Sequence, residues 1–176
     1  VLPGTYQVTL VVNGKRYTKP VTVRNDPRIE MTAPQVTAQH DAALNLERLS
    51  ARVNRVVANT DDILTQLGNL QTTLRRAPRG QNTPAVLAEV DSTIKDLRHF
   101  RDSVLARPLP GLGYRQYPRL REEVQSVSGS VSRTQWPVTA GEQLRSNELK
   151  EESDVAQGRL DQIISIRIGK INQLLA

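Results

Sequence analysis

The first 24 residues alternate between apolar and polar side chains, and this period-two pattern ends before the helical part of the chain. The alternation runs through residues 5–12 and returns in residues 17–23. Asn13-Gly14 separates the two runs, and this dipeptide favours a type I′ turn because both central residues need a positive φ. The pattern predicts one β-hairpin. One face of the first strand would carry Tyr6, Val8, Leu10 and Val12, and one face of the second would carry Tyr17, Lys19, Val21 and Val23.

A hairpin of this kind needs a partner surface, because two strands alone are marginally stable in water. Pro20 cannot donate a ladder hydrogen bond, so we expect the second strand to lie at a sheet edge at that point. We interpret the hairpin as the last two strands of an incomplete immunoglobulin-like sandwich, whose other strands precede Val1 or come from another chain. The alternative is that the hairpin caps the helices that follow it. Tyr6, Val8 and Leu10 are therefore candidate interaction residues.

The longest apolar pattern in the chain follows a capping-box sequence at Thr32–Gln35. Its positions are separated by steps of four and three, which is the spacing of a heptad seam. The seam consists of Ala42, Leu46, Leu49, Val53, Val56, Thr60, Ile63, Leu67, Leu70 and Leu74. It predicts one helix of about 40 residues, or about 60 Å at 1.5 Å per residue.

Three further amphipathic segments complete the chain. A helix starts at Thr83-Pro84 and ends before Pro108, a weaker one carries an apolar stripe from Tyr117 to Val131, and a last one follows a capping box at Thr139–Glu142. The last stripe contains Leu160, Ile164, Ile168, Ile171 and Leu175. The fold class predicted is mainly α. We expect a hairpin in residues 1–28 and an antiparallel bundle of three to four long helices in residues 29–176.

Two arrangements of these helices are compatible with the sequence. Short loops favour an up-down-up-down bundle of four helices. Alternatively, the second and third helices together span the length of the first, and the bundle is then three-stranded along its axis.

The residue types that carry reaction chemistry are sparse. The chain has no cysteine, which excludes disulfides and thiolate sites. His40 and His99 have no further ligands at metal-site spacing, and adjacent carboxylates on a helix point in different directions. No apolar run approaches the roughly 20 residues of a membrane span. We expect no catalytic residue, no metal and no cofactor within this chain.

The net charge of +6 raises the possibility of an acidic partner such as nucleic acid. The densest basic patches are Arg75, Arg76 and Arg79, and Arg115, Arg119 and Arg121. Basic residues nevertheless occur in every segment without a block of five or more like charges, which favours an ordinary solvated surface. Binding of nucleic acid through these arginines would weaken steeply with salt.

Trp136 is the single tryptophan, and it stands between two predicted helices. It could form a glycan platform together with Tyr114 and Tyr117. We favour the other interpretation, in which Trp136 is a hydrophobic plug at the end of the bundle.

The segment PGTYQVTLVVNGKRYTKPVTVRNDPR, followed by long helices, resembles the C-terminal region of secreted bacterial proteins with BNR-type, sortilin-like β-propeller repeats. These proteins are often labelled glycoside-hydrolase-like. In that family the propellers come first, a short immunoglobulin-like segment follows, and a helical tail ends the chain. The resemblance implies a periplasmic or extracellular location and supplies the missing strands, but it brings no active site.

The hypothesis that follows is a non-catalytic structural or interaction module at the C-terminal end of a larger exported protein. Its partners would be the upstream domains of the same protein or another protein subunit. The alternatives are an accessory glycan-contacting module of a carbohydrate-active enzyme and a basic helical binder of nucleic acid or of an anionic surface.

Overall fold

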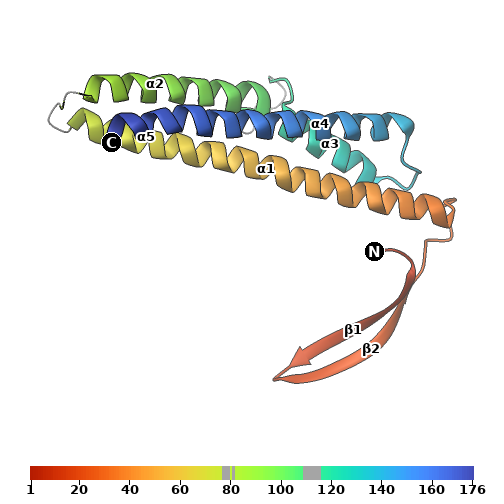
Figure 1. The fold of residues 1–176 in the computed structure, drawn as a ribbon. Helices are drawn as coiled ribbons and strands as arrows, with labels where there is room; N and C mark the ends of the chain where they lie inside the picture. Colours follow the sequence, from red (N-terminus) through yellow and green to blue (C-terminus); the bar gives the residue numbers. More distant parts are fainter. Residues whose placement is uncertain (77–79, 81, 109–115) are drawn as a thin grey trace.

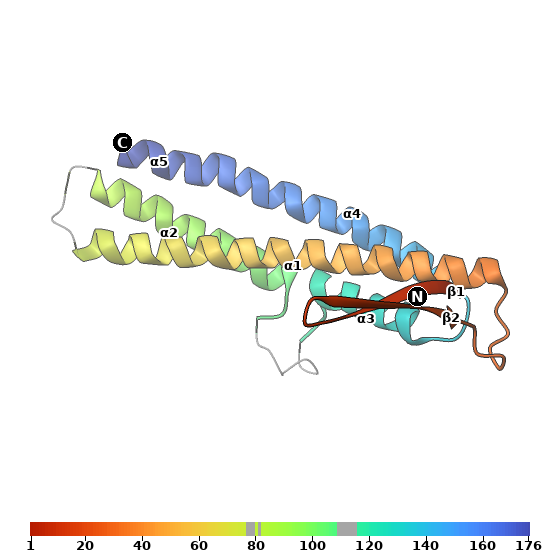
Figure 2. The same ribbon diagram turned by 90° about the horizontal axis from the view of Figure 1, so that it is seen from below.

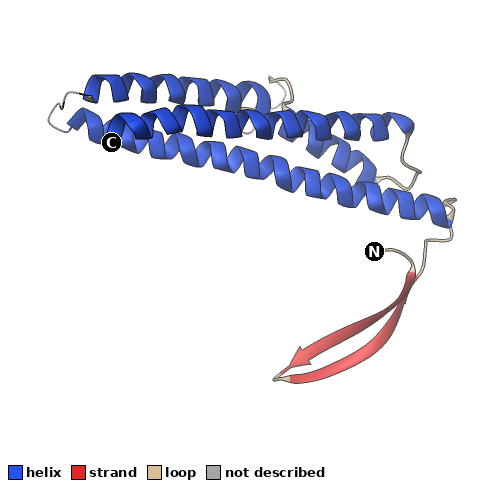
Figure 3. Cartoon of the chain, in the orientation of Figure 1, coloured by secondary structure: helices blue, strands red, loops and turns tan. Residues whose placement is uncertain are grey.

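The computed structural model describes residues 1–76, 80, 82–108 and 116–176. Their chain forms two parts, a β-hairpin and an elongated helical bundle (Figure 1). The hairpin joins the bundle at the N-terminal end of the longest helix and projects away from it. Figure 3 shows that the strands lie entirely outside the helical part. The prediction of a mainly helical protein preceded by one hairpin is confirmed.

The hairpin consists of β1 (Gly4–Val12) and β2 (Lys15–Val23), which pair antiparallel. Val12 lies opposite Lys15, so the turn contains only Asn13 and Gly14. Both turn residues have a positive φ, 49° and 77°, which is the type I′ geometry that the sequence predicts.

Helix α1 (Ala33–Arg76) is 44 residues long and forms one side of the bundle along its whole length. The Thr32 N–H donates to Gln35 Oε1 at 2.8 Å, and the Gln35 N–H donates to Thr32 Oγ1 at 3.4 Å. The predicted capping box is therefore present. The predicted seam faces the other helices, and every one of its ten positions is buried or half-buried.

The remaining helical elements form two further rods beside α1. They are α2 (Thr83–Phe100), η1 (Arg101–Leu105), α3 (Leu120–Arg133), α4 (Ala140–Ile163), η3 (Ile164–Ile168) and α5 (Gly169–Leu175). Figure 2 shows α2 and α3 lying one after the other along α1, with α4 and α5 as one continuous rod. The α2 helix contacts α1 and α5, whereas α3 contacts α1 and α4. Of the two expected arrangements, the three-stranded one is found.

The core of the bundle is built from aliphatic side chains and one aromatic ring. The largest fully buried side chains are Phe100, Leu46, Leu97, Leu105, Leu149, Leu160, Ile171, Val53, Val56, Val86, Val90 and Val124. The Arg159 guanidinium lies 4.9 Å from the centroid of the Phe100 ring, a cation–π contact that covers the aromatic face.

Two π-helical turns shift the buried face of their helices. In η1 the buried positions step from Phe100 to Leu105, and the Ala106 N–H donates to the Arg101 carbonyl at 3.0 Å, five residues back. In η3 the core-facing positions step from Ile163 to Ile168 in the same way. The extra residue places Ile164 at the surface, and Leu175 at the end of the chain is also exposed, so the predicted stripe of the last helix is wrong at these two positions.

Candidate docking surface

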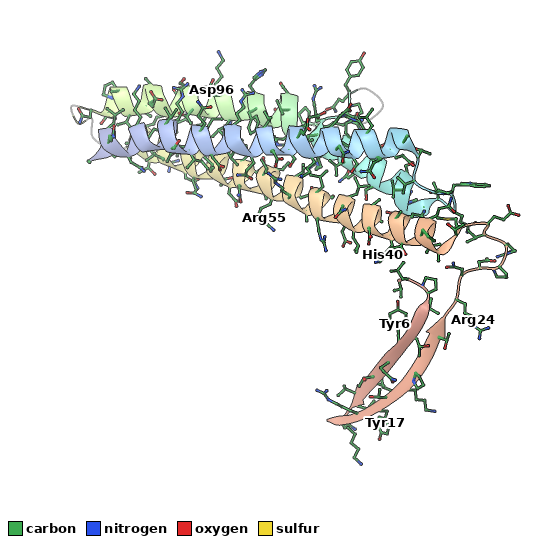
Figure 4. All side chains as sticks on the ribbon, turned by 45° about the vertical axis from the view of Figure 1, so that its right-hand side comes forward. Tyr6, Tyr17, Arg24, His40, Arg55 and Asp96 are labelled. Carbon is green, nitrogen blue, oxygen red and sulfur yellow. The ribbon has the colours of Figure 1, made fainter. Side chains whose placement is uncertain are left out.

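One face of the hairpin is apolar and exposed. Strand register places its members together: Tyr6, Val8, Leu10, Val12, Tyr17 and Val21. Between 38 and 61% of each of these residues is accessible to solvent. In Figure 4, Tyr6 lies near the base of the hairpin and Tyr17 near its tip, both clear of the bundle. The predicted face thus exists, and none of the helices in the described residues covers it.

The opposite face of the hairpin is mainly polar. Thr9 and Thr18 lie opposite each other there, and their hydroxyl oxygens are 2.8 Å apart. At the start of β1, the Tyr6 hydroxyl donates to the Leu2 carbonyl at 2.6 Å and fixes the incoming chain. The hairpin is therefore a formed amphipathic ribbon with one apolar face and one polar face.

The link between the hairpin and α1 contains a tight turn held by Asp26. The Arg28 backbone N–H donates to Asp26 Oδ1 at 2.9 Å, and the Arg28 Nε donates to the same oxygen at 3.0 Å. These hydrogen bonds from Arg28 hold the pKa of Asp26 below its ordinary value. The turn is closed by a hydrogen bond from the Ile29 N–H to the Asp26 carbonyl at 3.0 Å.

A cluster of charged side chains joins α2 to the last rod. Glu89 accepts from Arg167 at 2.8 Å and from Lys170 at 2.7 Å, while Arg167 also pairs with Asp96. The hydrogen bond from Lys170 is the largest influence that lowers the pKa of Glu89, and burial opposes it. Glu89 is thus an ionised, doubly paired carboxylate, and it fixes the register of two helices.

Sequence reasoning missed this cluster, although a signal for it was present. Glu89 and Asp96 are seven residues apart on α2, and Arg167 and Lys170 are three apart on the last rod, so each pair shares a helix face. The spacing alone does not reveal which two faces meet.

Other ion pairs serve the same structural purpose. Arg101 Nε donates to Asp61 Oδ1 at 3.0 Å and ties η1 to α1. Arg145 pairs with carboxylates from two helices: Glu123, Glu148 and Glu152. Each of these groups already has a charged partner, as expected of pairs that hold helices together.

The predicted basic residues do not form one surface among the described residues. Arg75 and Arg76 end α1, whereas Arg119 and Arg121 lie at the start of α3. Arg75 contacts Asp91, whereas Arg119 contacts Asp102, eleven residues further along α2 and η1, or about 16 Å at 1.5 Å per residue.

The arginine side chains at the start of α3 already have hydrogen-bond partners. Arg119 Nε donates to the Asp102 carbonyl at 3.1 Å, and Arg121 Nε donates to Glu122 Oε1 at 3.0 Å. At the end of α1, Arg75 lies 3.6 Å from Asp91. Arg79 and Arg115 lie outside the described residues.

The aromatic side chains do not converge either. Trp136 is 73% exposed, so the interpretation of this residue as a buried plug is wrong. Its neighbours Pro137 and Val138 are half-buried. Tyr117 is 84% exposed and precedes α3, whose 14 residues span about 21 Å. Trp136 follows α3, and Tyr114 lies outside the described residues.

The bundle surface contains an apolar groove of about 600 Å³. The groove is lined by the apolar residues Phe100, Val104, Leu120, Val155 and Ala156 and by three glutamates and Arg159.

Within the described ranges, no group of three or more potential metal ligands is found. His99 Nδ1 lies 3.2 Å from Ser103 Oγ, and both residues are exposed on the surface of the bundle.

No helix in the described part of the chain is long and apolar enough to span a lipid bilayer. No protein family, curated protein or solved structure matches the chain.

Proposed function

We propose that this chain is a non-catalytic docking module, whose hairpin supplies the last two strands of a β-sandwich. The other strands belong to a preceding domain of the same exported protein, as the resemblance to secreted propeller proteins implies. The observation that carries the proposal is the apolar face of the hairpin, which is formed, contiguous and exposed.

Physical reasoning supports an occupant for this face. Contiguous exposed apolar patches are rare on soluble monomers and mark interaction surfaces. Alternation along both strands, interrupted at Val11 and Lys19, is typical of a sheet with one buried face, and a hairpin without a third strand or a covering layer is marginal. The bundle beside it has its own closed core, so the helices do not depend on the hairpin.

The charge of the hairpin favours a different protein segment over a second copy of this chain. Residues 1–25 contain four basic residues and no acidic residue, which gives a charge of +4. Two copies placed face to face would bring these charges together at a cost. Lys15 and Lys19 lie on the apolar face itself, so the occupant would carry carboxylates opposite them.

A pair of matched substitutions tests the proposal. The protein is expressed as residues 1–176 and as the same chain extended upstream along its reading frame. Leu10→Lys places a charge in the centre of the apolar face, whereas Gln7→Lys places it on the opposite face. Calorimetry then follows unfolding of the preceding domain and of the bundle.

We expect Leu10→Lys to destabilise the preceding domain by about 3 kcal/mol or more, because it buries a charge and loses a leucine contact. Gln7→Lys should leave that domain unchanged. Both variants should leave the bundle of the unextended chain unchanged. Equal behaviour of the two variants in the extended protein would refute the proposal.

A further inference from the structure

The two edges of the hairpin differ, and we infer that the next strand of the assembled sheet pairs with β1, leaving β2 as the edge strand. This inference rests on the proposed function, because it names the side on which the missing strands join. It is carried by the register, the turn and the distribution of charge and proline between β1 and β2.

The register determines which backbone groups face outward. A two-residue turn closes on a pair that exchanges both hydrogen bonds, here Val12 and Lys15, and the two kinds of pair alternate along an antiparallel ladder. The residues whose N–H and C=O groups face away from the partner strand are therefore Thr5, Gln7, Thr9 and Val11 on β1, and Arg16, Thr18, Pro20 and Thr22 on β2.

On β2, the outward edge is blocked at one of its four positions. Pro20 lies opposite Gln7 in an outward-facing pair, so the N–H that it lacks is one that a further strand would use. The strand also contains Lys15, Arg16 and Lys19. Lysine and proline on an exposed strand are the features by which natural sheets prevent further pairing at an edge.

On β1, none of these features is present. The sequence of Gly4–Val12 is GTYQVTLVV, which contains no charged residue and no proline. Its four outward positions recur about every 6.8 Å, and each has both a donor and an acceptor. An uncharged, uninterrupted strand is typical of the interior of a sheet, where strands pair on both sides.

The occupant is thus a β-strand of the preceding domain that pairs with the outer edge of β1. Its apolar residues continue the face of Tyr6, Val8 and Leu10. The sheet packed over that face supplies the carboxylates for Lys15 and Lys19. Both contacts lie on one continuous surface, since β1 provides the open edge and most of the apolar face.

Amide hydrogen exchange in the extended protein tests this assignment, with residues 1–176 as the reference. We expect exchange at Thr5, Gln7, Thr9 and Val11 to slow by at least about tenfold, because new ladder hydrogen bonds protect them. Exchange at Arg16, Thr18 and Thr22 should not change. Protection of the β2 set instead would overturn the inference while leaving the proposed docking intact.

If neither set is protected, the edge assignment is wrong, and the reactivity of Tyr6 and Tyr17 separates the remaining cases. Tyrosines that become shielded show that the face is covered without strand addition. Tyrosines that stay reactive show that the proposed function has failed as well.

Thr9→Pro and Thr18→Pro form a matched pair for a second test. The two threonines are cross-strand partners, both variants lose the same hydroxyl contact, and neither N–H belongs to the ladder of the hairpin. In the extended protein, Thr9→Pro should abolish the protection of the β1 amides from exchange. Thr18→Pro should leave that protection unchanged. Equal effects would overturn the inference.

Discussion

Arg167 donates to Glu89 at 2.8 Å, a contact between residues 78 positions apart that joins the π-turn of the last rod to α2. Glu89 is the one acidic side chain that is buried among the described residues. The contact links α2 to the last rod at one relative height of the two helices.

Replacing Glu89 by alanine removes this contact. We expect Glu89→Ala to lower the free energy of unfolding by about 1–2 kcal/mol, because Lys170 loses its partner and Arg167 keeps only Asp96, while both cations still reach water. Urea denaturation measures the loss. Glu47→Ala is the matched control on an exposed face of α1 and should change stability by less than about 0.5 kcal/mol.

The pKa of Glu89 predicts the direction of the pH dependence. Because Lys170 and Arg167 lower that pKa below its ordinary value of 4.5, the folded state binds fewer protons than the unfolded state in that range. The stabilisation is therefore complete above about pH 4.5 and is lost as the pH falls through the lower, folded value. The stability difference between the protein and Glu89→Gln should shrink as the pH falls from about 5 into the acid range. A difference that stays constant would contradict this assignment.

The capping box of the last rod offers a test that is independent of charge pairs. The Glu142 N–H donates to Thr139 Oγ1 at 3.2 Å, and the Thr139 N–H donates to Glu142 Oε2 at 2.9 Å. Thr139→Ala should cost about 1 kcal/mol. Thr37→Ala in α1 is the control, since its hydroxyl bonds only to the Ala33 carbonyl within the helix, and alanine there should be neutral or slightly stabilising.

Two glycines distinguish the stability of the hairpin from that of the bundle. Gly14 has a φ of 77°, and no atom lies within 4 Å of an added Cβ, so Gly14→Ala acts through backbone strain alone. We expect it to destabilise the hairpin by about 1 kcal/mol and to leave the thermal midpoint of the bundle unchanged.

Gly129→Ala in α3 also meets open space and should stabilise the bundle by up to about 1 kcal/mol. Chemical shifts of the strand residues report the first effect, and thermal unfolding reports the second.

Local patterns in the sequence predicted the local structure well. The alternation around Asn13-Gly14 predicted the hairpin and its two-residue turn, and the capping boxes at Thr32 and Thr139 located two helix starts. The heptad seam of α1 was predicted at every position. These features depend on contacts within a few residues or on a strict period, so the sequence alone specifies them.

The features that were missed depend on how separate elements meet. A period of 3.6 does not anticipate the step of five at each π-turn, so Ile164 was placed in the core and lies at the surface. Trp136 was expected to plug the end of the bundle, but it is exposed, and its neighbours Pro137 and Val138 are half-buried instead.

The most direct test of the account is the reactivity of three tyrosines toward nitration in the extended protein. Tyr6 and Tyr17 lie on the apolar face of the hairpin, and Tyr117 is an exposed internal reference on the bundle. In residues 1–176 alone, all three should react. In the extended protein, we predict that the preceding domain shields Tyr6 and Tyr17 while Tyr117 reacts as before. If Tyr17 remains as reactive as Tyr117, the hairpin has no docked partner and the central claim is wrong.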